Sequence, residues 1–200
     1  MNKVTDWTSL NYVVVDVEGN GQQPPDLVEL AAVPIVGGVI GEPVSWLVKP
    51  ETPIKHFATR IHGLTHKDVA ECPAFADIKD DVLSTMKGAA LVAHNAHVDV
   101  DVLTRMLGDW KTPEVLDTLK LARRLVPGQD SYRLGNLVDA FKLADGLPEG
   151  LTPHRANHRA TYDALVAVRL FVLLATKARS VEELRGDSPG GGEDEAQALF

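Results

Sequence analysis

The sequence is poor in cysteine, with only Cys72 among its 200 residues. A single cysteine excludes a disulfide bond within the chain and fits a protein kept in a reducing compartment. The first residues include no apolar run of the signal-peptide type. The most apolar stretch, around residues 165–175, is interrupted by Arg169 and is too short to span a bilayer. We therefore expect a soluble, cytoplasmic protein with no membrane partner.

Positive charge is also scarce, because 20 lysines and arginines face 28 acidic residues and the net charge is −8. This balance argues against a broad basic surface for nucleic acid. The excess of negative charge is concentrated in residues 181–200, where six acidic residues and one basic residue give a net charge of −5. Residues 1–180 therefore carry a net charge of −3. Cations bound at an acidic site would neutralise that remainder. A protein that holds only the end of a strand needs few phosphate contacts, so this charge is compatible with a nucleic-acid partner.

The order of apolar runs indicates an α/β fold with a mixed sheet. Three antiparallel strands are expected first, over residues 12–18, 27–36 and 39–48, with a turn at Gly37-Gly38. Alternating elements follow: strands at 89–93 and 115–116, a loop or short helix at 53–63, a short helix at 65–70 capped by Thr65 and Asp68, and helices at 75–86, 99–107, 117–125, 133–141 and 159–177. We expect one domain over residues 10–179 and a disordered acidic tail over residues 180–200.

The most informative stretch is the first strand and its end. Val13, Val14 and Val15 suit a strand that is covered on both faces. Asp16 and Glu18 are two residues apart, so their side chains point to the same side of a strand. Two neighbouring carboxylates repel one another unless a cation lies between them, and a divalent metal ion is the obvious candidate. A strand end with two solvated acids is the alternative interpretation.

A second polar cluster follows the strand at residues 89–93. There Asn95 can present its amide to a ligand, and Asp99 opens the next helix facing the end of the sheet. His97 and Asp101 are rival ligands. Taken alone, His94-Asn95 is also typical of a turn that caps a helix.

A third cluster contains His158 and Asp163, which lie five residues apart. Five residues of an α-helix turn through roughly 500°, so the two side chains would be about 140° apart. His158 must therefore lie in the preceding loop or the first turn, while Asp163 projects from the helix itself. A histidine on a loop beside a metal-binding carboxylate suits a general base. Without the other clusters, a helix-start residue and a solvated acid would explain the pair as well.

Together the three clusters resemble the motifs of the DEDDh 3′–5′ exonucleases. This ribonuclease H-like family includes the proofreading subunit of bacterial DNA polymerase III, ribonuclease T and oligoribonuclease. The matching residues are Asp16-x-Glu18, His94-Asn95-x-x-x-Asp99 and His158-x-x-x-x-Asp163. The resemblance covers about residues 10–175. Residues 108–110, 117–124, 127–128 and 150–151 are similar to the exodeoxyribonuclease X branch. Gly19-Asn20-Gly21 stands where the family mostly carries Thr-Thr-Gly.

The resemblance implies a ribonuclease H-like mixed sheet flanked by helices, and an enzyme that releases mononucleotides from DNA 3′ ends. It also implies that two Mg²⁺ or Mn²⁺ ions are held by Asp16, Glu18, Asp99 and Asp163, with Asp16 favoured as the bridging ligand. His158 would take the proton from the attacking water. Two metal ions about 3.5–4 Å apart supply a hydroxide and stabilise the leaving oxygen, and oxygen ligands favour these ions over zinc.

Two rival assignments of site residues are resolved by the family's spacing. Asp99 is preferred to Asp101 because it lies five residues after His94. His158 is preferred to His154, which starts the same His-Arg-Ala triplet, because only His158 has the spacing to Asp163. The family also has a tyrosine variant, but the corresponding position here is Arg159, so the histidine branch fits.

The resemblance implies substrate contacts as well. Val17, Gly19 and Asn20 are expected to border the terminal base and sugar, and Asn95 and Ala96 to line the same pocket. His62 and Leu64 are expected to stack or wedge against the last bases. Glu29 is expected to brace a loop or a buried hydrogen bond outside the site.

Two other functions stay open. One is an exoribonuclease with the same fold and metal ions, because the pocket decides whether a 2′-OH is tolerated. The other is a nucleic-acid-binding relative without activity, against which the retention of all five catalytic and metal-binding residues argues. The oligomeric state is open, a homodimer included.

Overall fold

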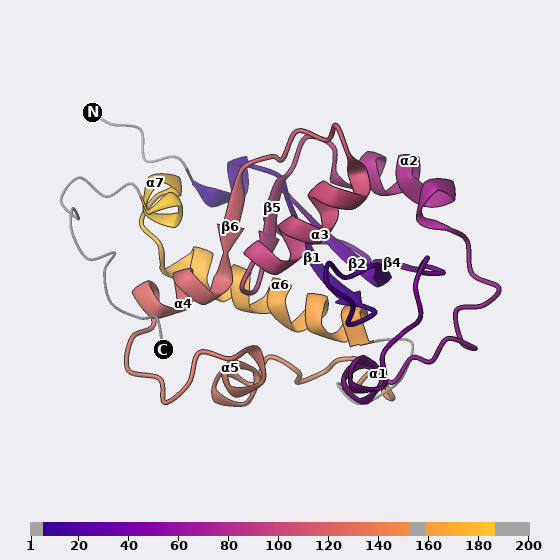
Figure 1. Ribbon diagram of the computed structural model, residues 1–200. Helices are drawn as coiled ribbons and strands as arrows, with labels where there is room; N and C mark the ends of the chain where they lie inside the picture. Colours follow the sequence, from indigo (N-terminus) through magenta and orange to yellow (C-terminus); the bar gives the residue numbers. More distant parts are fainter. Residues whose placement is uncertain (1–5, 153–158, 187–200) are drawn as a thin grey trace.

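The computed structural model describes residues 6–152 and 159–186 (Figure 1). Within them the elements are a 3₁₀ helix η1 (Trp7–Ser9), strands β1 (Tyr12–Gly19), β2 (Leu27–Val36), β3 (Val39–Ile40), β4 (Val44–Leu47), β5 (Ala90–Ala93) and β6 (Val115–Asp117), and helices α1 (His56–His62), α2 (Phe75–Met86), α3 (His97–Leu107), α4 (Thr118–Leu125), α5 (Leu134–Phe141), α6 (Arg159–Lys177) and α7 (Val181–Arg185). The predicted α/β class with a mixed sheet flanked by helices is confirmed.

The sheet has the strand order β3-β2-β1-β5-β6, with β4 also pairing with β2. β1 and β2 are antiparallel, whereas β1, β5 and β6 run parallel to one another. The carboxyl ends of these three parallel strands therefore meet at one edge, where α/β proteins commonly bind ligands. The pairing of β1 with β5 stops at Val14 and Val92. The last part of β1, from Asp16 onward, extends beyond its parallel neighbour.

Alternation along β1 divides the core into two layers. Tyr12 and Val14 pack on one face of the sheet against α4, α5 and α6. Val13 and Val15 pack on the other face against α2 and α3. In Figure 1 α6 lies along one side of the strands and α3 along the other. By the same alternation, Asp16 and Glu18 belong to the face covered by α6.

The strand expected over residues 39–48 is instead divided into β3 and β4. The cause lies on the neighbouring strand, where Pro34 has no N–H to donate to the ladder. Gly41 approaches this proline closely: its N–H donates to the Pro34 carbonyl at 2.8 Å, and a Cβ at Gly41 would lie 2.9 Å from Pro34 Cγ. Pro43 ends the interruption before β4 begins at Val44.

Three other expectations need correction. Residues 65–70 form turns and no α-helix, although the Asp68 carboxylate accepts bonds from both the N–H and the hydroxyl of Thr65. Helix α3 begins at His97, two residues before Asp99. The predicted disordered tail is wrong over residues 181–185, which form α7 with Val181 and Leu184 buried. Residues 187–200 lie outside the described part of the chain.

In residues 6–152 and 159–186, no helix is long and apolar enough to cross a membrane.

Candidate active site

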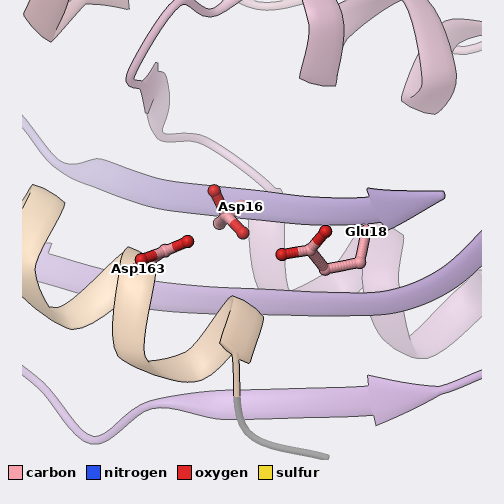
Figure 2. A group of neighbouring side chains, drawn as sticks. All are labelled: Asp16, Glu18 and Asp163. Atoms are coloured by element: carbon pink, nitrogen blue, oxygen red, sulfur yellow. The ribbon is translucent and has the colours of Figure 1, made fainter. Parts of the chain in front are cut away.

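Three carboxylates converge where β1 passes α6. One oxygen from each of Asp16, Glu18 and Asp163 lies within 4.8 Å of the other two. Figure 2 shows Asp16 and Glu18 projecting from the strand toward Asp163 on the helix. The strand alternation places the first two on the α6 face. The structure brings these three predicted residues together, and their role as metal ligands stays a prediction.

Asp99 approaches the same part of β1 from the first turn of α3. Its side chain is buried, and its Oδ1 accepts a hydrogen bond from the N–H of Val17 at 3.1 Å. This N–H belongs to the residue between Asp16 and Glu18. Asp99 is therefore adjacent to the cluster, although it is not among the three residues whose oxygens lie within 4.8 Å of one another. Asp101, the rival ligand, is exposed.

The cluster is electrostatically costly without a cation. Burial, followed by the charges of Asp99, Asp163 and Glu18, raises the pKa of Asp16 well above its usual value. Burial also raises the pKa of Glu18 to about 7 and that of Asp99 to about 8, and it raises the pKa of Asp163. Neighbouring carboxylates in a poorly solvated place disfavour one another's charged forms. A bound divalent cation would reverse this cost.

The donor set fits Mg²⁺ or Mn²⁺. The converging side chains supply only carboxylate oxygens, the hard ligands that these ions prefer, and they supply no thiolate or imidazole among the described residues. The four carboxylates come from both sides of β1, so together they could surround a bound ion with oxygen. The geometry thus fits a divalent-metal site.

The metal-free protein should lose stability as the pH rises. Because the folded-state pKa values of Glu18 and Asp99 are raised to about 7 and about 8, the folded state binds more protons than the unfolded state between about pH 4 and 8. The stability is fully present at low pH and falls as the pH rises toward the folded-state pKa values, by roughly 1.4 kcal/mol per pH unit for each proton that the folded state keeps and the unfolded state has lost. Urea denaturation in EDTA from pH 5 to 8 measures the fall, and Mg²⁺ should suppress it. A metal-free stability that rises over this range would contradict the assignment.

Arg159 already supplies one positive charge. Its Nε lies 3.0 Å from Glu18 Oε1 and 3.4 Å from Asp163 Oδ2. It occupies the position of the tyrosine in the family's tyrosine variant, and a guanidinium cannot serve as a base because it does not lose its proton in proteins. The histidine expected as the base, His158, and its rival His154 lie outside the described residues. The role of His158 stays a prediction.

A cavity of about 530 Å³ opens beside Asp16 and Asp163. Its walls include Asn95, one of the predicted substrate contacts, and also Arg123 and Arg133, which were not among the residues predicted from the sequence. The signal that could have found Arg123 is the basic run of residues 120–124 on one short helix. These two arginines place positive charge at the acidic site, in a chain whose overall charge is negative.

His94 connects segments of the chain that line this cavity. Its Nε2 lies 3.0 Å from the Tyr132 carbonyl oxygen and its Nδ1 lies 3.0 Å from the Thr118 hydroxyl. Since a carbonyl can only accept, Nε2 carries the proton and Nδ1 accepts from Thr118. Burial lowers the pKa of His94, which favours this neutral form. The histidine of the second motif is therefore a brace between β5 and residues 131–133.

Asn95 and Ala96 form the turn before α3. Their N–H groups donate to the two oxygens of Asp117 at 3.0 and 3.2 Å. Asn95 has a φ of 64°, in the left-handed region that asparagine tolerates better than most residues. Asn95 thus faces the cavity, whereas the side chain of Ala96 is buried. The turn interpretation holds for Asn95, and its contact with a substrate stays a prediction.

Asn20 is buried away from the site, contrary to the expected substrate contact. Its amide nitrogen donates to Thr52 Oγ1 at 2.7 Å, and its amide oxygen accepts from the N–H groups of Gln22 and Asp26 at 3.1 and 2.9 Å. The side chain is 0% exposed. All of this bonding capacity serves the loop after β1, so Asn20 fixes the shape of that loop.

His62 and Leu64 are also structural, and the structure does not show them as an exposed wedge. Leu64 is fully buried with Val28 and Val69. His62 Nδ1 accepts from the Leu64 N–H at 3.1 Å, so the opposite nitrogen, Nε2, donates to the Gly19 carbonyl at 3.2 Å. Burial lowers the pKa of His62 and keeps it neutral. This pair ties the end of α1 to the end of β1.

Glu29 braces the site from β2, as expected. It pairs with Glu18 across the two strands, and its Oε2 accepts from the N–H of Ala160 at 3.3 Å. Ala160 lies in the first turn of α6, where N–H groups lack partners within the helix. Glu29 is buried, and burial raises its pKa. It therefore anchors the start of the helix that carries Asp163.

Fold and site together define the class. A mixed sheet flanked by helices, with acidic residues at the end of its central strand and on the helix that crosses it, is the architecture of a ribonuclease H-like enzyme with a divalent-metal site.

Comparison with known proteins identifies the family to which the chain belongs. The exonuclease family (RNase_T) matches residues 13–171, and the chain belongs to this family. It is 36% identical over 173 residues to exodeoxyribonuclease 10 of Escherichia coli, covering 86% of this chain and 72% of that protein. The structure of exonuclease X in complex with 5′ overhanging duplex DNA matches with a TM-score of 0.71 and 32% identity, over 88% of this chain and 98% of that one. The predicted DEDDh-type, ribonuclease H-like identity is confirmed.

Other relatives are much longer proteins. The chain is 31% identical to DNA polymerase III PolC-type of Caldanaerobacter subterraneus and 31% identical to 3′–5′ exonuclease DinG of Bacillus subtilis. It covers only 12% and 18% of their lengths, so the likeness concerns one part of each protein.

Proposed function

We propose that this chain is a metal-dependent 3′–5′ exonuclease that removes mononucleotides from DNA ends. The observation that carries the proposal is the convergence of Asp16, Glu18 and Asp163 at the end of β1, in a chain of the exonuclease family. Relatives named as DNA exonucleases, and the exonuclease X structure with duplex DNA, support DNA as the substrate.

The chain's own residues have distinct tasks in this reaction. Asp16, Glu18, Asp99 and Asp163 would hold two Mg²⁺ or Mn²⁺ ions, which supply an activated water and stabilise the charge of the leaving 3′ oxygen. His158 would accept the proton of that water. Asn95 would orient the terminal nucleotide in the cavity beside Asp16, where Arg123 and Arg133 add positive charge near the phosphates. We further propose that the enzyme acts in the cytoplasm and that the domain predicted over residues 10–179 extends through α7, because Leu184 packs in the same core as α6.

The polarity of attack tests the function. A site that holds one terminal nucleotide should release mononucleotides stepwise from 3′-hydroxyl ends of labelled DNA with Mg²⁺. Circular DNA and 3′-phosphorylated DNA should resist, because neither offers a free 3′-hydroxyl end. Asp163→Asn, which keeps the shape of the side chain but removes its charge, is the matched inactive control. Cleavage of closed circles by the wild type, but not by this variant, would show an endonuclease.

The same assay with RNA distinguishes the alternative substrate. An enzyme that trims RNA 3′ ends at least as fast as DNA of the same sequence is an exoribonuclease, because only the pocket's tolerance of the 2′-OH differs between the two substrates.

A further inference from the structure

We propose that Arg159 is a built-in competitor of the metal ion. While no metal is bound, its guanidinium neutralises Glu18 and Asp163, and it must be displaced when a divalent cation binds. Arg159 then sets the metal concentration at which the enzyme becomes active. This inference rests on the proposed metal-dependent function and assigns a regulatory residue to it.

The first observation is that Arg159 shares its partners with the metal site. Its Nε lies 3.0 Å from Glu18 Oε1 and 3.4 Å from Asp163 Oδ2, and both residues belong to the three-carboxylate cluster. A divalent ion ligated by these carboxylates would need oxygens at about 2.0–2.6 Å. The guanidinium and the ion would therefore be like charges competing for the same acceptors, and they repel one another.

The second observation is that the ion pairs are poorly solvated. The side chains of Arg159, Glu18 and Asp163 are 26%, 13% and 16% exposed. Charges in such a place interact more strongly than at the open surface, and removing one partner leaves the other uncompensated. The geometry therefore stabilises the metal-free site, and any ion that binds must offset the loss of these pairs.

The third observation is that Arg159 has a hydrogen-bond partner outside the cluster and lies beside a groove into which its side chain could move. Its Nη1 donates to the Ile61 carbonyl at 3.2 Å, in the last turn of α1. It also lines a groove of about 650 Å³ between α5 and α6, which Asp139 lines as well. A guanidinium that leaves Glu18 can thus remain at the edge of the site with a new acidic neighbour within the same groove.

The spacing on α6 makes the arrangement specific. Arg159 and Asp163 are four residues apart, so they lie on the same face of the helix. A positively charged side chain at position 159 therefore faces the three-carboxylate cluster as long as α6 stays helical. A lysine there would keep the charge as a compact ammonium without the planar fork of arginine.

The test is direct binding of Mn²⁺ to the full-length, metal-free protein without nucleic acid, by titration calorimetry and by electron paramagnetic resonance of free Mn²⁺. Arg159→Gln should bind the ion roughly 5- to 150-fold more tightly than the wild type, the range of ordinary coupling between two sites. Arg159→Lys should lie close to the wild type because it retains the charge. The metal-induced rise in melting temperature should be larger in Arg159→Gln than in the wild type.

Arg169→Gln is the matched control. Arg169 lies on the same helix and donates to the Leu143 and Asp145 carbonyls at 2.8 and 2.7 Å, away from the cluster. Its loss should reduce stability without changing the affinity for Mn²⁺. Unchanged Mn²⁺ binding by a folded Arg159→Gln protein would overturn the proposal. Weaker Mn²⁺ binding would overturn it as well, because it would mean that the arginine organises the metal ligands. If the wild type hydrolyses DNA with Mn²⁺ in that case, the proposed function stands and only this inference fails; if the wild type binds no Mn²⁺, both fail.

Discussion

Removing divalent metal should abolish DNA hydrolysis, and adding Mg²⁺ or Mn²⁺ should restore it. The reason is the cluster of Asp16, Glu18 and Asp163, whose oxygens lie within 4.8 Å of one another and whose pKa values are all raised. Among the described residues of this cluster, no side chain can activate water in place of the metal ion. Arg159 neutralises charge there, but an arginine does not deprotonate and cannot activate water. The measurement is nucleotide release from a 3′-labelled strand in EDTA, followed by titration with each ion.

Single carboxylate variants give the control for this result. Asp163→Asn should reduce the rate by at least about 10³-fold at saturating metal, since it removes a ligand whose role is to hold the activating ion. Asp101→Asn, an exposed acid on α3 that was a rival to Asp99, should leave the rate nearly unchanged. Full activity in excess chelator would show that the proposed metal site does not drive the reaction.

Replacing His158 by alanine should lower the turnover rate by about 10²–10⁴-fold, the usual contribution of a general base. The affinity for metal should change much less, because the carboxylates that bind it remain. His158 immediately precedes α6, the helix that brings Asp163 and Arg159 to the cluster. The wild-type rate should rise with pH around the pKa of a histidine, blended with the ionisation of metal-bound water.

His154→Ala is the matched control for this prediction, because His154 begins the same His-Arg-Ala triplet four residues earlier. It should change the rate little. Melting temperature and Mn²⁺ affinity, measured on both variants, separate a catalytic role from a structural one. A His158→Ala protein that is stable, binds metal and degrades DNA at nearly the wild-type rate would exclude His158 as the base. His97 or an unassisted metal-bound hydroxide would then take its place.

The sequence predicted the carboxylate site in two ways. Alternation along β1 predicted that Asp16 and Glu18 share one face, and the resemblance to the exonuclease family joined them to Asp99 and Asp163. The bounds of α2 also follow from its apolar periodicity, because it buries Phe75, Val82 and Met86 against one side of the sheet. The alternation and the periodicity depend on neighbours within a few residues, so the sequence contains them.

The predictions from the sequence were wrong where contacts between residues from distant parts of the chain determine the local structure. The strand expected over 39–48 is interrupted because Pro34 on the neighbouring strand and Pro43 within the stretch itself both lack the N–H that the ladder needs. His62 and Leu64 were expected to contact the last bases, yet His62 bonds to the end of β1 and Leu64 packs in a buried cluster. The tail begins with α7, where Arg124 of α4 donates to the carbonyl of Leu184 at 3.1 Å.

The sequence by itself determined the chemistry of this protein: the carboxylates, their spacing, and the elements that present them. Only the tertiary structure decided what each neighbouring side chain does. It turned Asn20 inward to bond its own loop, made His94 a brace, and placed Arg159 between Glu18 and Asp163. The physical reason is that strand and helix periodicities act over a few residues. Burial and ion pairing instead depend on residues that folding brings together from distant parts of the chain.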